Sequence, residues 1–125
     1  MNTKSVDSYI PEAKQALERF RIVENGKISK NFRGQISSFG AAVVMGSLPA
    51  AVAFFADQGS AQVDRSKLVS AMYYCVKKED AAPAEVLEYV CKNNTAQTRE
   101  DFINASIALK LAMNFFVLTQ KEEKV

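Results

Sequence analysis

FRGQISSFGAAVVMGSLPAAVAFF, residues 32–55, decides the fold of this 125-residue chain. Four of its apolar residues recur at spacings of three and four, the period of one helix face: Phe32, Ile36, Phe39 and Val43. Gly46 is expected to end this helix, and Ser47 is a favourable N-cap for a second helix over residues 48–58. Because the second helix is apolar on nearly every side, we expect it at the centre of a bundle or beneath a partner.

The same stretch raises the question of a membrane span. Residues 34–56 carry no charge, and a run of this length is what a transmembrane helix requires. A transmembrane helix, however, is apolar over about 20 continuous residues, whereas Gly46, Ser47 and Pro49 interrupt this run. A buried helical hairpin is therefore the preferred interpretation. Gly34 and Gly40 within the first helix are interpreted as points where helices approach closely, although each costs up to about 1 kcal/mol relative to alanine.

The helical period continues on both sides of this stretch, and the alternation typical of strands is absent. The first helix is expected to begin near Asp7 or Ser8 and to end at Gly26, and Ser29 is expected to cap the next one. After residue 58, a helix begins at Asp64, and a short helix is opened by Asp80 and Pro83 and ends at Asn93. The last helix begins with a capping box of Thr98 and Asp101. Connections are short, and no linker or repeat divides the chain. The sequence therefore predicts an all-α fold, one compact bundle of five to six helices that forms a single domain over residues 1–125.

The composition excludes most catalytic chemistry. The chain has no histidine, so the commonest general base and metal ligand are missing. Cys75 and Cys91 lie in apolar helical stretches and are expected to be small buried side chains. Four carboxylates lie among polar neighbours, as is typical of a solvated helix surface: Glu85, Glu88, Glu100 and Asp101. We expect a non-enzymatic protein without catalytic residues, metal or cofactor, and a cytoplasmic one, since no apolar signal-peptide run follows its start.

The basic residues are informative by position, because the net charge is only +2. Residues 1–33 hold seven basic side chains, including Lys4 and Arg19, against four acids. Lys14 and Arg21 are seven residues apart and are expected two turns apart on one helix face. The candidates for contact with RNA phosphates are Lys14, Arg21, Lys27, Lys30, Arg33, Lys77 and Lys78. Ordinary solvated surface charge is the alternative.

Aromatic residues offer a weaker signal. Most phenylalanines fall on the apolar helix stripes and are expected in the core. Tyr73 and Tyr74 are adjacent and cannot both point inward, so one of them is a candidate for a partner surface or for stacking on a base.

Two stretches of the chain resemble the small α-helical subunit of the type III-B CRISPR-Cas effector complex, the Cmr complex. The first is residues 32–55, with its aromatic-basic start, apolar helix, turn and second apolar helix. The second is DFINASIALKLAMNFFVLTQ, residues 101–120, which enters and leaves its helix on aromatic residues. The sequence departs from the family pattern at Gly40, where a proline is expected, and at residues 56–58, where a common lysine is absent.

The resemblance implies a structural role in antiviral defence. Several copies would stack head to tail beside larger subunits of the Cmr complex and flank the guide RNA and target RNA backbone through basic surface. Cleavage would belong to other subunits, and neither a membrane nor a small-molecule substrate is expected. The alternative is a protein-only adapter or regulatory helical bundle that does not bind RNA.

Overall fold

The structure, a computed structural model, describes residues 5–57 and 64–119, and most of these residues are helical. The elements of this part of the chain are, in order, α1 (Val6–Arg19), β1 (Lys27–Ser29), α2 (Lys30–Ser37), α3 (Phe39–Met45), α4 (Leu48–Ala56), α5 (Ser66–Lys77), α6 (Pro83–Lys92), α7 (Ala96–Ala112), the 3₁₀ helix η1 (Met113–Phe115) and β2 (Val117–Thr119). The predicted class, a helical bundle, is confirmed.

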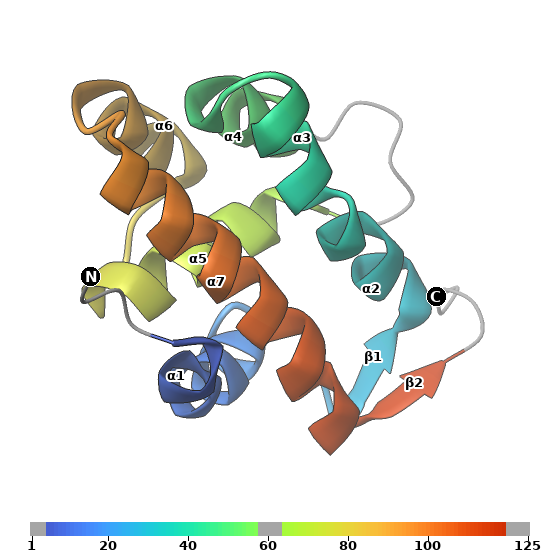
Figure 1. Cartoon of the computed structure of the whole chain (residues 1–125). Coiled ribbons are helices and arrows are strands. Elements are labelled where there is room, and N and C mark those ends of the chain that lie inside the picture. The colour runs from blue at the N-terminus through green and yellow to red at the C-terminus, as the bar shows by residue number, and fades with distance from the viewer. Residues whose placement is uncertain (1–4, 58–63, 120–125) are drawn as a thin grey trace.

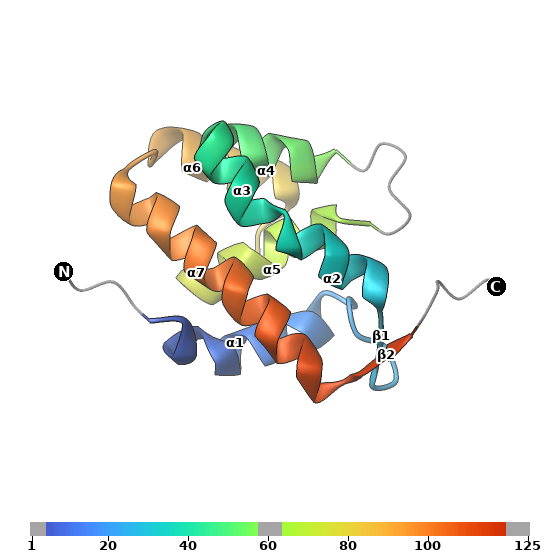
Figure 2. The same ribbon diagram turned by 45° about the vertical axis from the view of Figure 1, so that its right-hand side comes forward.

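Helix α7 is the longest described element and crosses the whole bundle (Figures 1 and 2). It packs against α1 and α5, and also against α2 and α3, while α4 packs on α6, α3 and α5. The residues of α7 that face these neighbours are fully buried, among them Phe102 and Leu109. Each large apolar side chain buried in this way contributes about 1.5–3 kcal/mol, so α7 is the central element around which the other helices are held.

The predicted apolar stripe of residues 32–55 is confirmed, but its helix is divided. All four stripe residues are buried, and Ser29 and Ser47 act as the predicted N-caps by accepting from the backbone N–H groups of Asn31 and Ala50. The helix stops after Ser37 and starts again as α3 at Phe39. The Ser37 and Ser38 hydroxyls donate to carbonyl oxygens of the preceding turn, at 2.7 and 2.9 Å. Serine hydroxyls that bond in this way compete with the helical ladder and bend a helix.

The two glycines of this region do not serve close helix packing. A Cβ added to Gly34 or Gly40 meets no atom within 4 Å, so both positions face open space and the prediction of close approach is wrong. In residues 5–57 and 64–119, no helix is long and apolar enough to cross a membrane. The uncharged run instead forms the short hairpin α3–α4, as the preferred interpretation expected.

Two helix boundaries differ from the prediction. Helix α7 begins at Ala96 with Thr95 as its N-cap; the Thr95 hydroxyl oxygen accepts from the Thr98 backbone N–H at 3.1 Å, so Thr98 is not the cap. Helix α1 ends at Arg19 rather than at Gly26. Ile22 and Val23 both donate their N–H groups back to Leu17 and are buried, so the chain leaves the helix in order to cover its end.

Other expectations concern single positions. Asp64 accepts from the Ser66 backbone N–H at 3.1 Å and so assists the start of α5, as predicted. Lys4 and the expected end of the helix of residues 48–58 lie outside the described residues.

The two strands were not predicted. β1 and β2 pair in parallel, with Lys27 opposite Val117 and Ser29 opposite Thr119. The pairing brings the segment after α7 beside the segment after α1, at the lower right of Figure 1. Each strand has only three residues, too few to show a period of two. The pairing of such short segments depends on where α1 and α7 end, and this is the feature that shapes the candidate site.

Candidate nucleic-acid interface

Residues 114–117 are the centre of the candidate interface. Helix α7 ends at Ala112, η1 follows, and Phe116 adopts an extended conformation that leads into β2. Met113 is fully buried and fixes this turn to the core, whereas Phe115 and Val117 are 60% and 62% exposed. The Val117 N–H donates to the Gly26 carbonyl oxygen at 2.9 Å, which ties the segment to the turn before β1.

Four of the seven predicted RNA-contact residues gather around this segment: Lys14, Lys27, Lys30 and Arg33. We call them the basic face. The Lys14 ammonium of α1 lies 5.2 Å from the centroid of the Phe115 ring. The Arg33 guanidinium of α2 donates to the side-chain oxygen of Asn114 at 2.9 Å. Lys27 pairs with Val117 across the strands, and Lys30 follows β1 directly as the first residue of α2.

Three cations of the basic face meet no acid in the part of the chain that the structure describes. Among residues 5–57 and 64–119, Lys14, Lys27 and Arg33 form no ion pair. Glu24 is bonded to Lys27 through main-chain atoms only, and the partner of Arg33 is a neutral amide. A cation held by a ring or an amide keeps its full charge for an anionic ligand, so this face attracts phosphate more strongly than the chain's net charge suggests.

An open depression of about 450 Å³ adjoins the basic face, lined by Lys30, Asn31, Gly34 and Gln35. Because Gly34 has no side chain and faces open space, the backbone of a ligand can approach α2 closely here. Polar side chains, not apolar ones, surround this depression. It is suited to a charged, hydrated ligand rather than to a small apolar molecule.

The other three predicted RNA-contact residues lie elsewhere. Arg21 does not share a helix face with Lys14, because α1 has already ended; Arg21 lies in a left-handed turn with φ 60°, and its carbonyl oxygen accepts from Lys67 at 3.2 Å. Lys77 lies 5.4 Å from the Tyr89 ring centroid, and Lys78 forms an ion pair with Glu12 at 3.8 Å. The structure therefore does not bring the seven residues into one surface.

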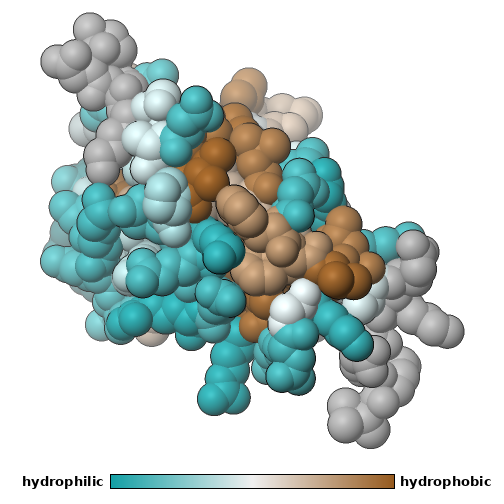
Figure 3. Space-filling model, turned by 90° about the horizontal axis from the view of Figure 1, so that it is seen from below, coloured by the Kyte–Doolittle hydropathy of each residue, from teal (hydrophilic) through white to brown (hydrophobic). Residues whose placement is uncertain are grey.

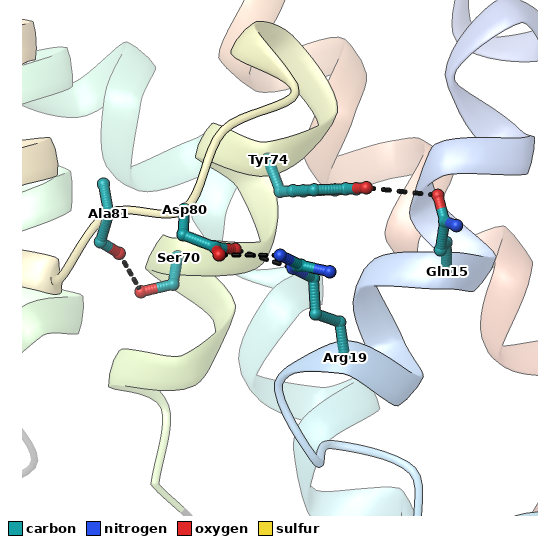
Figure 4. A network of polar contacts seen from close by, with 6 residues as sticks. All are labelled: Gln15, Arg19, Ser70, Tyr74, Asp80 and Ala81. Carbon is teal, nitrogen blue, oxygen red and sulfur yellow. Dashed lines mark hydrogen bonds and ion pairs between the residues drawn. The ribbon is translucent and has the colours of Figure 1, made fainter.

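A network of polar contacts ties α1 to α5 and to the loop before α6 (Figure 4). Arg19 donates twice to the Asp80 carboxylate, at 2.6 and 2.7 Å, and its guanidinium lies 5.1 Å from the Tyr74 ring centroid. Tyr74 in turn donates to Gln15 at 3.2 Å. The hydrogen bond from Arg19 holds the pKa of Asp80 below its ordinary value. Arg19 belongs to the basic N-terminal third of the sequence, but its charge is paired with Asp80 inside the chain.

The two tyrosine candidates are engaged within the fold, and a different aromatic ring is exposed. Tyr73 and Tyr74 are both half-buried and engaged: the rings of Tyr73 and Tyr89 meet edge to face at 5.4 Å, and Tyr74 meets Phe20 at 6.1 Å. Phe115, which was not among the predicted site residues, is the exposed aromatic ring beside the basic face. It follows α7 at a spacing of four from the exposed Leu111, and this spacing is the signal in the sequence that points to it.

The remaining acids and thiols form no candidate site. Two of the acids make contacts that stabilise a helix. Glu85 accepts from the Ala82 backbone N–H at 2.7 Å and so caps α6, and Glu88 pairs with Lys92 at 3.6 Å. Burial raises the pKa of the Cys75 thiol to about 12, whereas Cys91 is exposed, so the prediction that both are buried is wrong for Cys91. Residue 91 follows the buried Val90 by one position and so points away from the core. In the described part of the chain, no group of three or more potential metal ligands comes together.

Comparison with protein-family models, with curated proteins and with solved structures gives no match to this chain. The resemblance to the small Cmr subunit thus rests on the two stretches of sequence that carry it.

Proposed function

We propose that this protein is a non-catalytic structural subunit of a ribonucleoprotein and that its basic face lies along an RNA backbone. The observation that carries this proposal is the meeting of Lys14, Lys27 and Arg33, from three different elements, around residues 114–117. Lys27 and Arg33 are close in the sequence, and the fold brings Lys14 of α1 to the same segment. Their meeting at one surface, with no acid of residues 5–57 or 64–119 paired to them, is what a phosphate-binding surface requires.

Phosphate contacts of this kind position a protein on RNA without reading its sequence. Four cations neutralise too few phosphates for tight binding by one copy at physiological salt, because affinity grows with the number of phosphates neutralised. A subunit that binds beside other copies or other proteins adds their contacts to its own. Weak, sequence-independent binding by the isolated chain is therefore the expected behaviour.

The resemblance to the small Cmr subunit extends the proposal to a particular complex. Copies of the chain stack head to tail in the type III-B effector and flank the guide and target RNA in the cytoplasm, while other subunits cleave. Head-to-tail stacking needs two different contact surfaces on each copy. The exposed Val44, Met45 and Phe54 at the α3–α4 end support the presence of one such surface, far from residues 114–117.

A protein-only adapter is the second candidate, and one observation favours it. Ile107 and Leu111 of α7 are more than two-fifths exposed, and RNA phosphates do not bind aliphatic side chains. Recovery of the tagged protein from its host with a small RNA and larger CRISPR-associated subunits supports the ribonucleoprotein. Recovery with protein alone, unchanged by RNase, supports the adapter.

The direct test compares two triple charge reversals that change the net charge equally. Lys27→Glu/Lys30→Glu/Arg33→Glu alters the basic face, and Arg21→Glu/Lys77→Glu/Lys78→Glu alters the other three predicted residues. Each reversal changes the charge by −2, so both variants go from +2 to −4. Binding of a fluorescein-labelled RNA oligonucleotide is followed by anisotropy over a range of salt concentrations, and circular dichroism checks that each variant folds.

We expect the basic-face variant to lose at least about tenfold in affinity and its plot of log K against log salt to become shallower by about 2–3. The matched variant should retain most of its affinity, since Lys77 and Lys78 are held by Tyr89 and Glu12. Equal losses in the two variants would show that only net charge matters and would contradict the site. Retained affinity in the basic-face variant would contradict it as well.

A further inference from the structure

An exposed apolar stripe runs along α7 into η1 and meets the basic face at β2. Ile107, Leu111 and Phe115 follow one another at intervals of four residues and are 42%, 44% and 60% exposed. Val117 continues the line into β2 at 62%. Figure 3 views the molecule from the side of α1 and the end of α7, and apolar side chains form a band across this face. We call Ile107, Leu111, Phe115 and Val117 the apolar stripe.

Packing within the chain does not explain the apolar stripe. The opposite side of α7 is fully buried, including Phe102, Ala105 and Leu109, so the helix already has a complete inner face. A row of large apolar side chains at helical spacing on the outside is the pattern by which one helix receives another. Scattered exposed apolar residues are ordinary, but a contiguous row marks an interaction surface.

Cations flank the apolar stripe on both sides. On the side of α1, Lys14 lies 5.2 Å from the Phe115 ring centroid. On the other side, Lys110 precedes Leu111 and is one turn before Asn114, whose side chain bonds Arg33 of α2. Among residues 5–57 and 64–119, neither Lys14 nor Lys110 forms an ion pair. Asp7 and Glu18 share the exposed side of α1 with Lys14, so the positive charge of this side is confined to the part of α1 beside Phe115.

We propose that the apolar stripe is the docking site for an amphipathic helix of a different protein, with apolar residues at intervals of three or four and acidic residues beside them. The apolar residues of the partner cover Leu111 and Phe115, and its carboxylates meet Lys14 and Lys110. Charge complementarity of this kind selects the partner and speeds its association. Within the proposed ribonucleoprotein, the apolar stripe faces protein while Lys27, Lys30 and Arg33 face RNA.

A second copy of this chain does not match the stripe. The most acidic described segment of the chain is residues 79–88, which includes Glu79, Asp80, Glu85 and Glu88. Helix α6 lies within this segment, and its apolar residues Val86 and Val90 are buried in the core of the chain. It therefore has no exposed apolar row with which to cover the stripe. RNA matches it poorly, because Ile107, Leu111 and Val117 are aliphatic and only Phe115 offers a ring on which a base stacks.

Two synthetic helical peptides with the same leucine face test the proposal on the full chain, one with glutamates beside that face and one with lysines. Binding of each labelled peptide is followed by fluorescence anisotropy at low and high salt. The variant is Leu111→Asp. The matched control is Val44→Asp, which introduces the same charge at an exposed apolar residue of α3. Sedimentation of the free protein measures self-association, and binding of the RNA oligonucleotide to the Leu111→Asp variant is measured alongside.

We expect the glutamate peptide to bind at least about tenfold more tightly than the lysine peptide, and less tightly at high salt. Leu111→Asp should weaken binding about tenfold or more, and Val44→Asp should leave it unchanged. Equal binding of the two peptides, no saturable binding, or an unaffected Leu111→Asp variant would overturn the proposal.

Two further outcomes would assign the stripe to another occupant and so also overturn it. One is a dimer of the free protein that Leu111→Asp dissociates, and the other is RNA binding that Leu111→Asp weakens as much as it weakens peptide binding. The RNA experiment with Lys27, Lys30 and Arg33 alters none of the four stripe residues, so the failure of either proposal is recognised separately.

Discussion

The two ends of the bundle hold their basic residues in different ways. Near α5 and α6, Arg19 and Lys78 of the chain meet the carboxylates of Asp80 and Glu12, and the contacts join α1 to α5. Near the end of α7, Lys14 and Arg33 meet an aromatic ring and a neutral amide. The first set of charges is used to hold the fold together. The second set is held in position with its charge uncompensated, which is the arrangement expected where a ligand brings the opposite charge.

This difference does not follow from counting charges along the chain. Arg19 and Arg21 are two residues apart, and both belong to the basic N-terminal third, yet of the two only Arg19 reaches an acid among residues 5–57 and 64–119. The acid it reaches is 61 residues away. Whether a cation is paired within the chain or left for a partner depends on such long-range contacts. Variants at the two ends of the bundle test this difference separately.

The largest effect among the remaining tests is expected for Val117→Pro at the basic end. Proline removes the N–H that donates to Gly26 and so separates β2 from β1. Lys27 then loses its fixed place beside residues 114–117, and RNA affinity should fall roughly tenfold through lost phosphate contacts. Val117→Thr keeps the N–H and the β-branched shape and serves as the control, with affinity close to wild type. Equal affinity of the two variants would show that the strand pair does not position the basic face.

A smaller effect is expected for Asp80→Asn at the other end. The hydrogen bond from Arg19 lowers the pKa of Asp80 from its ordinary value of 3.8, so the ionised carboxylate stabilises the folded state. This contribution is fully present above the ordinary pKa and is lost as the pH falls through the lowered one. The Tm of wild type should therefore exceed that of Asp80→Asn at neutral pH, and the two values should converge below about pH 4.

The control for this second test is Glu88→Gln, which removes a carboxylate from the exposed pair with Lys92 inside one helix. Such pairs contribute little, so the Tm should change less. RNA affinity should be unchanged in Asp80→Asn. A difference in Tm between wild type and Asp80→Asn that does not shrink as the pH falls below 3.8 would contradict the assignment of the effect to the ionised carboxylate.

The features that repeat locally could be predicted from the sequence. The stripe of Phe32, Ile36, Phe39 and Val43 is set by the helical period, and the caps at Ser29 and Ser47 depend only on neighbouring residues. The break at Ser38 was missed because two successive serine hydroxyls bond back to the preceding turn. The period of the apolar residues carries no sign of that competition.

The candidate site was only partly predictable. Lys27, Lys30 and Arg33 are close in sequence and were expected to act together, but their meeting with Lys14 depends on the strand pair that no local pattern announced. Phe115 was not singled out, because its exposure depends on the turn at η1, which the helical period does not show. Lys110 beside the apolar stripe was missed for the same reason, since its importance comes from where α7 ends.

The most direct test of the RNA-binding surface is a ¹H–¹⁵N NMR titration of the protein with a short RNA oligonucleotide. The account predicts that the shifted backbone signals belong to Lys27, Lys30 and Arg33 and to residues 114–117, that the shifts shrink as salt is added, and that Lys77 and Lys78 stay unchanged. Shifts that centre on Lys77 and Lys78, or that spread evenly over the surface, would contradict it.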